Sequence, residues 1–295
     1  MPTRETSFRT AIVVVALALP LTSPAWASGP GHGQPPVTEK DFNSANFSPD
    51  STTITNRFLP LVPGTQFVLD GTANRGSGSG THEVIFTVTD VTKWVDHVRT
   101  LVIWDRDVQD GVLAEEELSF FAQDKAGNVW YLGENPDVYG NGTVTADATW
   151  LAGHLQAIPG LAMRLSPRVD TSSYLQGSAP NADFLDQATV VKANQRTCVP
   201  AGCYKGVLIV DEFDPNHQPQ DGHQFKYHAP GVGIVRVEPR GGTEQETLVL
   251  SELRHLDATQ LAAARDRALA LDKLAYQLAP AVWSHTPNAV PLAAP

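Results

Sequence analysis

The feature that most constrains the fold is a long succession of short strand-like runs that no helical pattern interrupts. Between residues 57 and 256, runs rich in Val, Ile, Thr and aromatic residues alternate with clusters of Gly, Pro, Asn and Asp. In 83–91, apolar and polar residues alternate as they do in a strand with one buried face. A parallel α/β fold would need helices between its strands. The sequence therefore predicts a mainly β fold, either a curved antiparallel sheet or an open β-barrel.

One helix is expected after these strands. Apolar residues recur there at spacings of three and four, which defines one helix face; they are Leu261, Ala264, Ala268, Leu271, Ala275 and Leu278. Asp257 suits the N-cap position, and Gln260 follows three residues later, as in a capping box. We predict a C-terminal helix over 257–278, packed on the sheet within a single domain of 57–278. An alternative role for this helix is partner binding, in a cell-surface interaction module.

The N-terminus has the pattern of a secretory signal. Arg4 and Arg9 precede an apolar run over 11–21, and Ala25-Trp26-Ala27 provides the small residues of a cleavage site. We predict a signal peptide over 1–27 and a secreted or periplasmic protein after cleavage near Ala27. The apolar run is too short to cross a bilayer and no later run is long enough, so an integral membrane protein is not expected.

The composition of the two flanking segments predicts little regular structure in them. Residues 28–56 are rich in Gly, Pro, Ser, Asn and Thr, which is typical of a flexible leader. Residues 279–295 are rich in Pro and Ala, and we predict that this tail is disordered.

Charge and cysteine content narrow the possible partners and the compartment. The formal net charge is −11, which disfavours nonspecific binding to nucleic acid and would attract cations. The two cysteines, Cys198 and Cys203, enclose a short segment that contains Pro and Gly. In an oxidising compartment we predict that they form a disulfide bond, with an entropic contribution of about 2 kcal/mol.

Two hairpins are predicted in the centre of the chain. In the first, aromatic-rich runs flank 124–128, where Gly127 can adopt the positive φ of a turn. In the second, strands over 98–107 and 114–123 are joined at Asp110-Gly111. If the second hairpin packs its apolar residues together, Asp105 should lie beside Glu116 on the face that carries Phe120.

Paired carboxylates next to an apolar pocket can act as general acid and base. A secreted hydrolase or cyclase is therefore an alternative function, and its candidate catalytic residues are Asp105, Glu116, Gln123 and His228. The acidic segment also suggests a divalent-cation site, with Asp105, Asp107 and Glu116 as ligands; no other cofactor is predicted. It does not match an EF-hand, because its glycine is the seventh residue of 105–116 and its flanks are strand-like.

The favoured function is binding of a hydrophobic small molecule or lipid in a cavity lined by the sheet. A β domain of this length can enclose an apolar cavity, and several aromatic residues are expected to face inward. The candidate ligand-binding residues are Trp104, Phe120, Trp130 and Tyr131.

Two sequence motifs resemble a family of uncharacterised secreted bacterial β-rich proteins. The first is Ala-Gln-Asp-x-x-Gly-Asn-Val-Trp-Tyr-x-Gly-Glu at 122–134, and the second is Lys-Tyr-x-Ala-Pro-Gly-Val-Gly at 226–233. The resemblance covers about 56–257 and implies an exported β-rich domain without an assigned catalytic residue. Members of that family often have an aromatic residue at the position of His228 and a threonine at that of Cys203. The strand pattern is also similar, more distantly, to open half-barrels that carry lipids in the periplasm.

Overall fold

The computed structural model describes residues 37–74, 78–140, 142–217, 219, 221–243 and 245–292. The predicted signal peptide and its cleavage site lie outside these residues. The described strands belong to one antiparallel sheet. They are β1 (Thr65–Asn74), β2 (Ser79–Val95), β3 (Val98–Gln109), β4 (Val112–Gln123), β5 (Val129–Gly140), β6 (Thr143–Ala146), β7 (Trp150–Leu151), β8 (Ile158–Met163), β9 (Tyr174–Ala179), β10 (Phe184–Val199), β11 (Gly202–Phe213), β12 (His223–Ala229), β13 (Gly233–Arg240), β14 (Gln245–His255) and β15 (Val290–Pro291).

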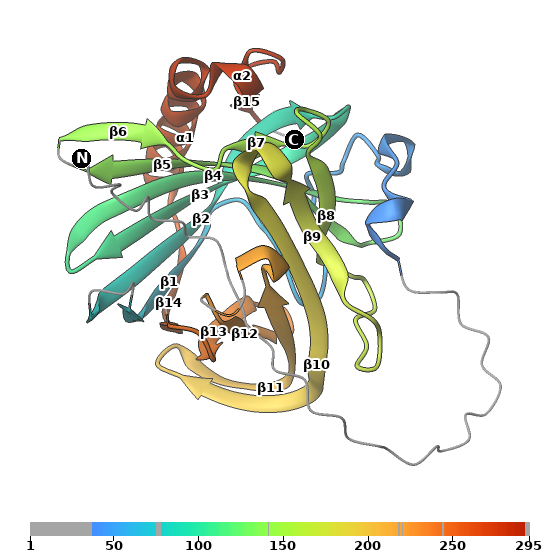
Figure 1. Ribbon diagram of the computed structural model, residues 1–295, viewed down its shortest axis with the longest axis vertical. Helices are drawn as coiled ribbons and strands as arrows, with labels where there is room; N and C mark the ends of the chain where they lie inside the picture. Colours follow the sequence, from blue (N-terminus) through green and yellow to red (C-terminus); the bar gives the residue numbers. More distant parts are fainter. Residues whose placement is uncertain are drawn as a thin grey trace.

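The sheet closes on itself into a barrel (Figure 1). Neighbouring strands of the wall follow one another along the chain from β1 to β5 and from β8 to β14, and β8 pairs directly with β5. β1 then pairs with both β14 and β2, which completes the ring. The predicted mainly β fold is confirmed, and closure leaves the wall without the free edge of an open sheet.

Both predicted hairpins are present. β3 and β4 are joined at Asp110 and Gly111, whose φ angles of 50° and 78° match a two-residue type I′ turn. β4 and β5 are joined through Gly127, with a φ of 94°. In the turn between β4 and β5, Asp124 accepts hydrogen bonds from the backbone and side-chain nitrogens of Asn128, each at 2.9 Å.

A β-bulge in the hairpin of β3 and β4 changes which residues meet across it. Gln109 pairs with Val112 beside the turn, but Ala114 is skipped, so that Asp105 pairs with Glu117 instead of Glu116. Because side chains alternate along a strand, this shift by one residue exchanges the faces of β4 relative to β3. The predicted adjacency of Asp105 and Glu116 is therefore wrong. Phe120 lies opposite Val102, on the outer face of the wall.

Two C-terminal helices cover that outer face. They are α1 (Ala258–Leu278) and α2 (Pro280–Trp283), drawn in red in Figure 1. α1 lies against β2, β3 and β4. Asp257 caps α1 and forms the expected capping box with Gln260, so the predicted helix is confirmed. Its buried apolar residues are Ala264, Ala268, Leu271 and Ala275.

The predicted disorder of the tail is wrong for the described residues up to 292. Trp283 is fully buried, with its ring 5.8 Å from that of Phe120. Val290 and Pro291 add a short strand, β15, to β2. The composition of the tail was misleading because one large aromatic residue anchors a segment that is otherwise poor in strong structure formers.

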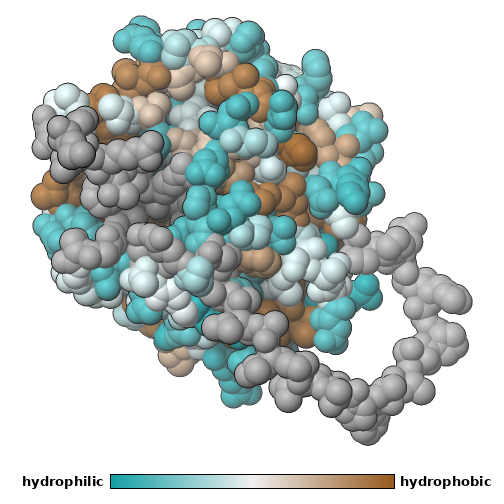
Figure 2. All heavy atoms as spheres, viewed as in Figure 1, coloured by the Kyte–Doolittle hydropathy of each residue, from teal (hydrophilic) through white to brown (hydrophobic). Residues whose placement is uncertain are grey.

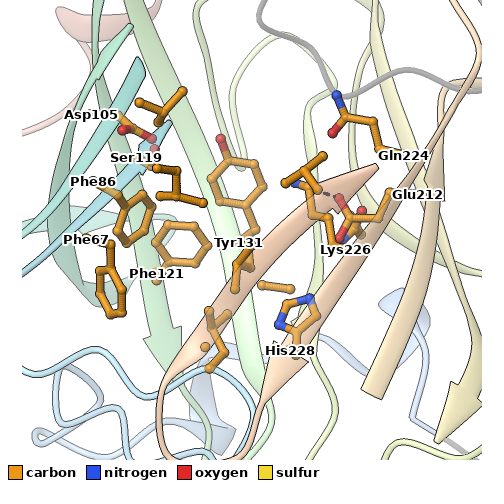
Figure 3. Close-up of a pocket in the computed structure, with 18 of the residues that line it drawn as sticks. Phe67, Phe86, Asp105, Ser119, Phe121, Tyr131, Glu212, Gln224, Lys226 and His228 are labelled. Carbon is orange, nitrogen blue, oxygen red and sulfur yellow. Dashed lines mark hydrogen bonds and ion pairs between the residues drawn. The ribbon is translucent and has the colours of Figure 1, made fainter. Parts of the chain in front are cut away.

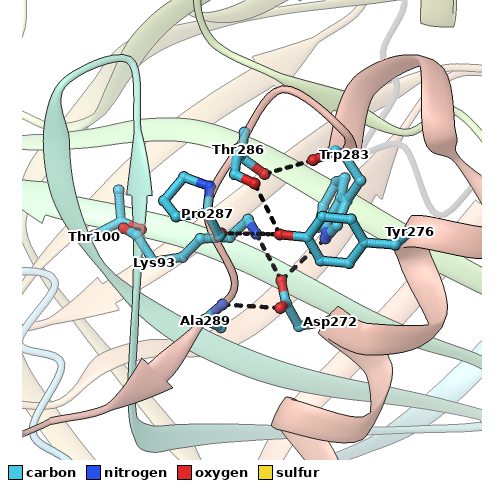
Figure 4. Close-up of polar contacts among 8 residues, drawn as sticks. All are labelled: Lys93, Thr100, Asp272, Tyr276, Trp283, Thr286, Pro287 and Ala289. Carbon is cyan, nitrogen blue, oxygen red and sulfur yellow. Dashed lines mark hydrogen bonds and ion pairs between the residues drawn. The ribbon is translucent and has the colours of Figure 1, made fainter.

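A buried ion pair fastens this C-terminal segment to the wall (Figure 4). Lys93 on β2 donates to Asp272 of α1 and to the carbonyl oxygen of Pro287, both at 2.8 Å. Asp272 also accepts from the indole nitrogen of Trp283 at 3.0 Å and from the backbone nitrogen of Ala289 at 2.9 Å. Every oxygen of the carboxylate is thus used, which is what a buried charge requires.

The N-terminal segment covers another part of the outer face. The rings of Phe42 and Phe47 lie 5.3 and 6.4 Å from that of Trp130, in edge-on contacts. Ile54, later in the same N-terminal segment, is also buried. The described part of the predicted leader, 37–56, therefore packs against the barrel.

The predicted disulfide between Cys198 and Cys203 is confirmed, and it joins the facing ends of β10 and β11. Within the residues that the structure describes, neither α-helix has the length and apolarity needed to cross a membrane. On the face shown in Figure 2, outside the grey atoms, hydrophobic residues form small groups among hydrophilic ones.

Candidate functional site

The interior of the barrel contains a cavity of about 220 Å³. One part of its wall is apolar, and Figure 3 shows Phe67, Phe86 and Phe121 there. The rings of Phe67 and Phe86 are 5.9 Å apart, and Phe121 stacks on Tyr131 at 4.8 Å. Other apolar lining residues are Leu59, Leu61, Leu69, Val84, Ala162, Phe184, Val232, Ile234, Val237 and Leu248.

The wall of the cavity is also rich in carboxyl groups. They come from six different strands and are Asp105, Glu117, Glu134, Asp186, Glu212 and Glu246. Among the described residues that line the cavity, Lys226 is the sole lysine or arginine. In Figure 3, Asp105 and Ser119 lie on the side of the phenylalanines, whereas Lys226, Glu212 and His228 lie across the cavity from them.

Two of these carboxylates have cationic partners. Glu212 is 2.8 Å from the Nζ of Lys226 and accepts from Gln176 at 3.2 Å. Glu246 is 3.0 Å from Nδ1 of His82, whose Nε2 lies 2.7 Å from Asp107. Burial alone would lower the pKa of His82, but its contacts with these two carboxylates raise it to about 9. His82 is therefore a cation at neutral pH.

The other four carboxyl groups have no ion-pair partner among the described residues. Burial raises the pKa of Asp105, Glu134 and Asp186 well above the usual range, and negatively charged neighbours raise each of them further. Burial also raises the pKa of Glu117, against the effect of a hydrogen bond from Ser119. Glu134 accepts a hydrogen bond from Tyr131.

His228 faces the cavity as a neutral imidazole. Its Nδ1 lies 3.1 Å from the carbonyl oxygen of Phe58, which can only accept, so Nδ1 carries the hydrogen. Burial lowers the pKa of His228 to about 4. The other nitrogen, Nε2, has no hydrogen-bond partner and presents a lone pair.

The structure separates the four residues predicted to be catalytic. Asp105 and His228 line the cavity. Glu116 points to the outer face, where it binds Arg267 of α1 and accepts from the indole nitrogen of Trp104 at 3.0 Å. Gln123 accepts from the backbone nitrogen of Thr55 at 2.9 Å.

The aromatic residues predicted to bind a ligand are also divided between the two faces. Tyr131 lines the cavity, whereas Phe120 packs under α2 and Trp130 under the N-terminal segment. Trp104 lies beside Glu116 and under the guanidinium of Arg106. As for the predicted cation site, the described residues contain no group of three or more His, Cys, Asp or Glu side chains arranged to hold a metal ion.

Several cavity residues were missed at the level of sequence. Gln224, Lys226 and His228 stand at alternate positions of β12 and therefore share one face. Because His228 was already a predicted site residue, this alternation could have predicted the other two. Phe67 carried no such signal, because its strand buries residues on both faces. Asp186 shares the buried face of β10 with Phe184 and Ala188, but the alternation of that strand does not reveal that this face carries an acid.

No known family model matches the sequence, and comparison with curated proteins finds no relative. Two solved structures are similar to part of the chain. A candidate lipoprotein from Parabacteroides distasonis has 15% identity and a TM-score of 0.38. A candidate exported protein with a YmcC-like fold from Bacteroides fragilis has 14% identity and a TM-score of 0.39. Each match covers 68% of this chain and 99% of the other.

Proposed function

We propose that this is an exported protein that binds a hydrophobic small molecule inside its barrel. The observation that carries the proposal is the cavity of about 220 Å³ with phenylalanines in its wall. Protein interiors are normally packed as closely as organic crystals, with few voids larger than a water molecule. An apolar cavity with a few polar groups in its wall is the usual form of a small-molecule site.

Export is supported by two independent features. The N-terminal sequence has the basic, apolar and small-residue regions of a signal peptide. The bond between Cys198 and Cys203 is of a kind that persists in oxidising compartments.

The alternatives have less support. An acid–base enzyme built on the predicted residues would need Asp105 and Glu116 together, and they point to opposite faces of the wall. An interaction module that uses α1 would need its apolar face, which is buried against the barrel.

A binding experiment with a small neutral probe tests the proposal. We expect hexan-1-ol to bind the purified protein with one saturable site, detected by ligand-observed NMR. Ala162 lines the cavity, so Ala162→Phe should fill it and weaken binding by at least about tenfold, since each factor of ten corresponds to about 1.4 kcal/mol.

The matched control is Ala193→Phe, at an exposed position of β10. This variant should bind the probe as the unmodified protein does. Absence of saturable binding to the unmodified protein, or equal binding by both folded variants, would refute a cavity-binding function.

A further inference from the structure

We propose that the ligand of this cavity is an organic cation: an apolar body that carries a protonated amine with N–H groups. This inference rests on the proposed function and names the class of ligand. The apolar body would contact the phenylalanine rings, and the ammonium group would lie among the carboxyl groups.

The charge balance of the wall is the first argument. Lys226 pairs with Glu212, and His82 pairs with Glu246 and Asp107. No other Lys, Arg or His⁺ among the described residues is paired with the remaining carboxyl groups, which are Asp105, Glu117, Glu134 and Asp186. Four acidic groups with little exposure around one cavity are costly unless they are protonated or a cation lies among them.

The unpaired hydrogen-bonding atoms are the second, independent argument. Four buried atoms of the lining have no partner: Oδ1 of Asp105, Oδ1 of Asp186, Oε1 of Gln224 and Nε2 of His228. Asp186 is 6% exposed and His228 is 2% exposed, so water outside the protein does not satisfy them. Apart from the proton that an acid can hold, all four atoms are acceptors. The complementary ligand supplies N–H donors, and an ammonium group supplies both the donors and the charge.

The same features favour an organic cation over a metal ion. The described side chains form no metal-binding group of three or more. The acceptors instead come from separate strands around the wall, β3, β10 and β12. A metal ion would also leave the apolar part of the cavity unused, whereas an alkyl or aralkyl amine would occupy both parts.

Binding of such a cation should release protons. An ammonium group favours the ionised forms of the carboxyl groups, which are otherwise held protonated by burial and mutual repulsion. Affinity should therefore rise with pH while the amine stays protonated. The titratable and charged side chains that face the site are Asp105, Glu117, Tyr131, Glu134, Asp186, Glu212, Lys226, His228 and Glu246, with His82 and Asp107 behind them.

The test compares four probes that share a six-carbon chain, by calorimetric titration of the purified protein at pH 7. They are hexylamine, hexyltrimethylammonium, hexan-1-ol and hexanoate. We expect hexylamine to bind at least about tenfold more tightly than hexan-1-ol, and hexanoate to bind most weakly. Hexyltrimethylammonium should fall between the amine and the alcohol, because it has the charge without N–H donors.

A double variant and a control variant test whether the preference for hexylamine arises in the cavity. The double variant Asp105→Asn, Asp186→Asn should lose most of its preference for hexylamine and keep its affinity for hexan-1-ol within about twofold. It removes unpaired buried acids, so it should remain folded. The control is Asp70→Asn, at an exposed position on the outer face of β1, which should change neither affinity.

The outcomes separate this inference from the proposed function. Equal affinity for hexylamine and hexan-1-ol, or an unchanged preference in the double variant, would overturn the cation inference and leave the cavity-binding function intact. Equal affinity for the amine and its trimethyl analogue would overturn the requirement for N–H donors. If none of the probes bound, the proposed function would fail together with the inference.

Discussion

At the scale of single residues, the ion pair between Lys93 and Asp272 places two charged groups in the interior of the protein. Neither partner is accessible to solvent, and Lys93 also faces the rings of Tyr276 and Trp283 at 5.2 and 5.0 Å. Burial lowers the pKa of Lys93, and the charge of Asp272 opposes this effect. The buried ammonium group of Lys93 is therefore stabilised by the carboxylate that lies against it.

We expect Asp272→Ala to lower the free energy of unfolding by about 3–5 kcal/mol, because it leaves a buried ammonium group unpaired. Urea denaturation followed by tryptophan fluorescence measures the change. The double variant Lys93→Met, Asp272→Leu should recover much of the loss. The control Asp266→Ala, at an exposed position of the same helix, should change stability by less than about 0.5 kcal/mol. A small effect of Asp272→Ala would mean that the pair does not fasten the C-terminal segment.

The sequence identified individual site residues only in part. Of the predicted site residues, Asp105, Tyr131 and His228 line the cavity. Glu116, Trp104 and Phe120 do not, although Trp104 directly precedes Asp105, and Glu116 and Phe120 pair with Arg106 and Val102 of the same strand. A side chain's face depends on its exact register, and no property of the individual residue reveals it.

At the scale of elements, the bulge at Ala114 decides the chemistry of the cavity. Without it, the pairing at the turn would continue and Asp105 would meet Glu116. With it, Glu117, Ser119 and Phe121 face the interior. Many of the strands, both hairpins and the capped helix followed from alternation and turn residues. The bulge did not, because one extra residue in a strand leaves no distinct mark in composition.

Deletion of Ala114 should therefore destabilise the fold far more than its replacement. The deletion removes the extra residue and drives the rest of β4 to exchange its faces, which would put Phe120 inside the barrel and Glu117 under α1. We expect the cooperative thermal unfolding transition, monitored by circular dichroism, to be lost. The substitution Ala114→Ser keeps the residue count and should retain the transition. A cooperative, near-native transition in the deletion variant would contradict the assigned register.

At the scale of the whole molecule, much of the hydrophobic core lies outside the barrel. Helices and the N-terminal segment cover Phe120 and Trp130 on the outer face, while acidic groups occupy part of the interior. Sequence patterns predict which residues alternate, but they do not say which face is the inside. This is why the β class could be predicted, whereas three of the four aromatic ligand-binding candidates pointed outward.

The polar interior also predicts how stability depends on pH. Carboxyl groups with raised pKa values bind more protons in the folded state, so stability falls as pH rises above about 4. His82, with its pKa raised to about 9, stabilises the fold fully below pH 6.5 and loses this contribution as pH rises through 9. For His82 the contribution is on the order of 3 kcal/mol.

Urea denaturation of the ligand-free protein at a series of pH values between 4 and 10 measures this dependence. His82→Gln should flatten the decline between pH 6.5 and 9, and Asp186→Asn should flatten the part at lower pH. A decline above pH 6.5 that His82→Gln leaves unchanged would show that another group is responsible.

The closure of the wall between β1 and β14 determines the order in which the strands of the barrel pair during folding. The other seams of the barrel join strands that are close in sequence, whereas this one brings Thr65 to His255. Local hairpins form within microseconds, but contacts between distant parts of a chain form late and slowly. We therefore expect the ring to close last, and a chain that crosses a membrane N-terminus first cannot complete its barrel until its final wall strand has emerged on the far side.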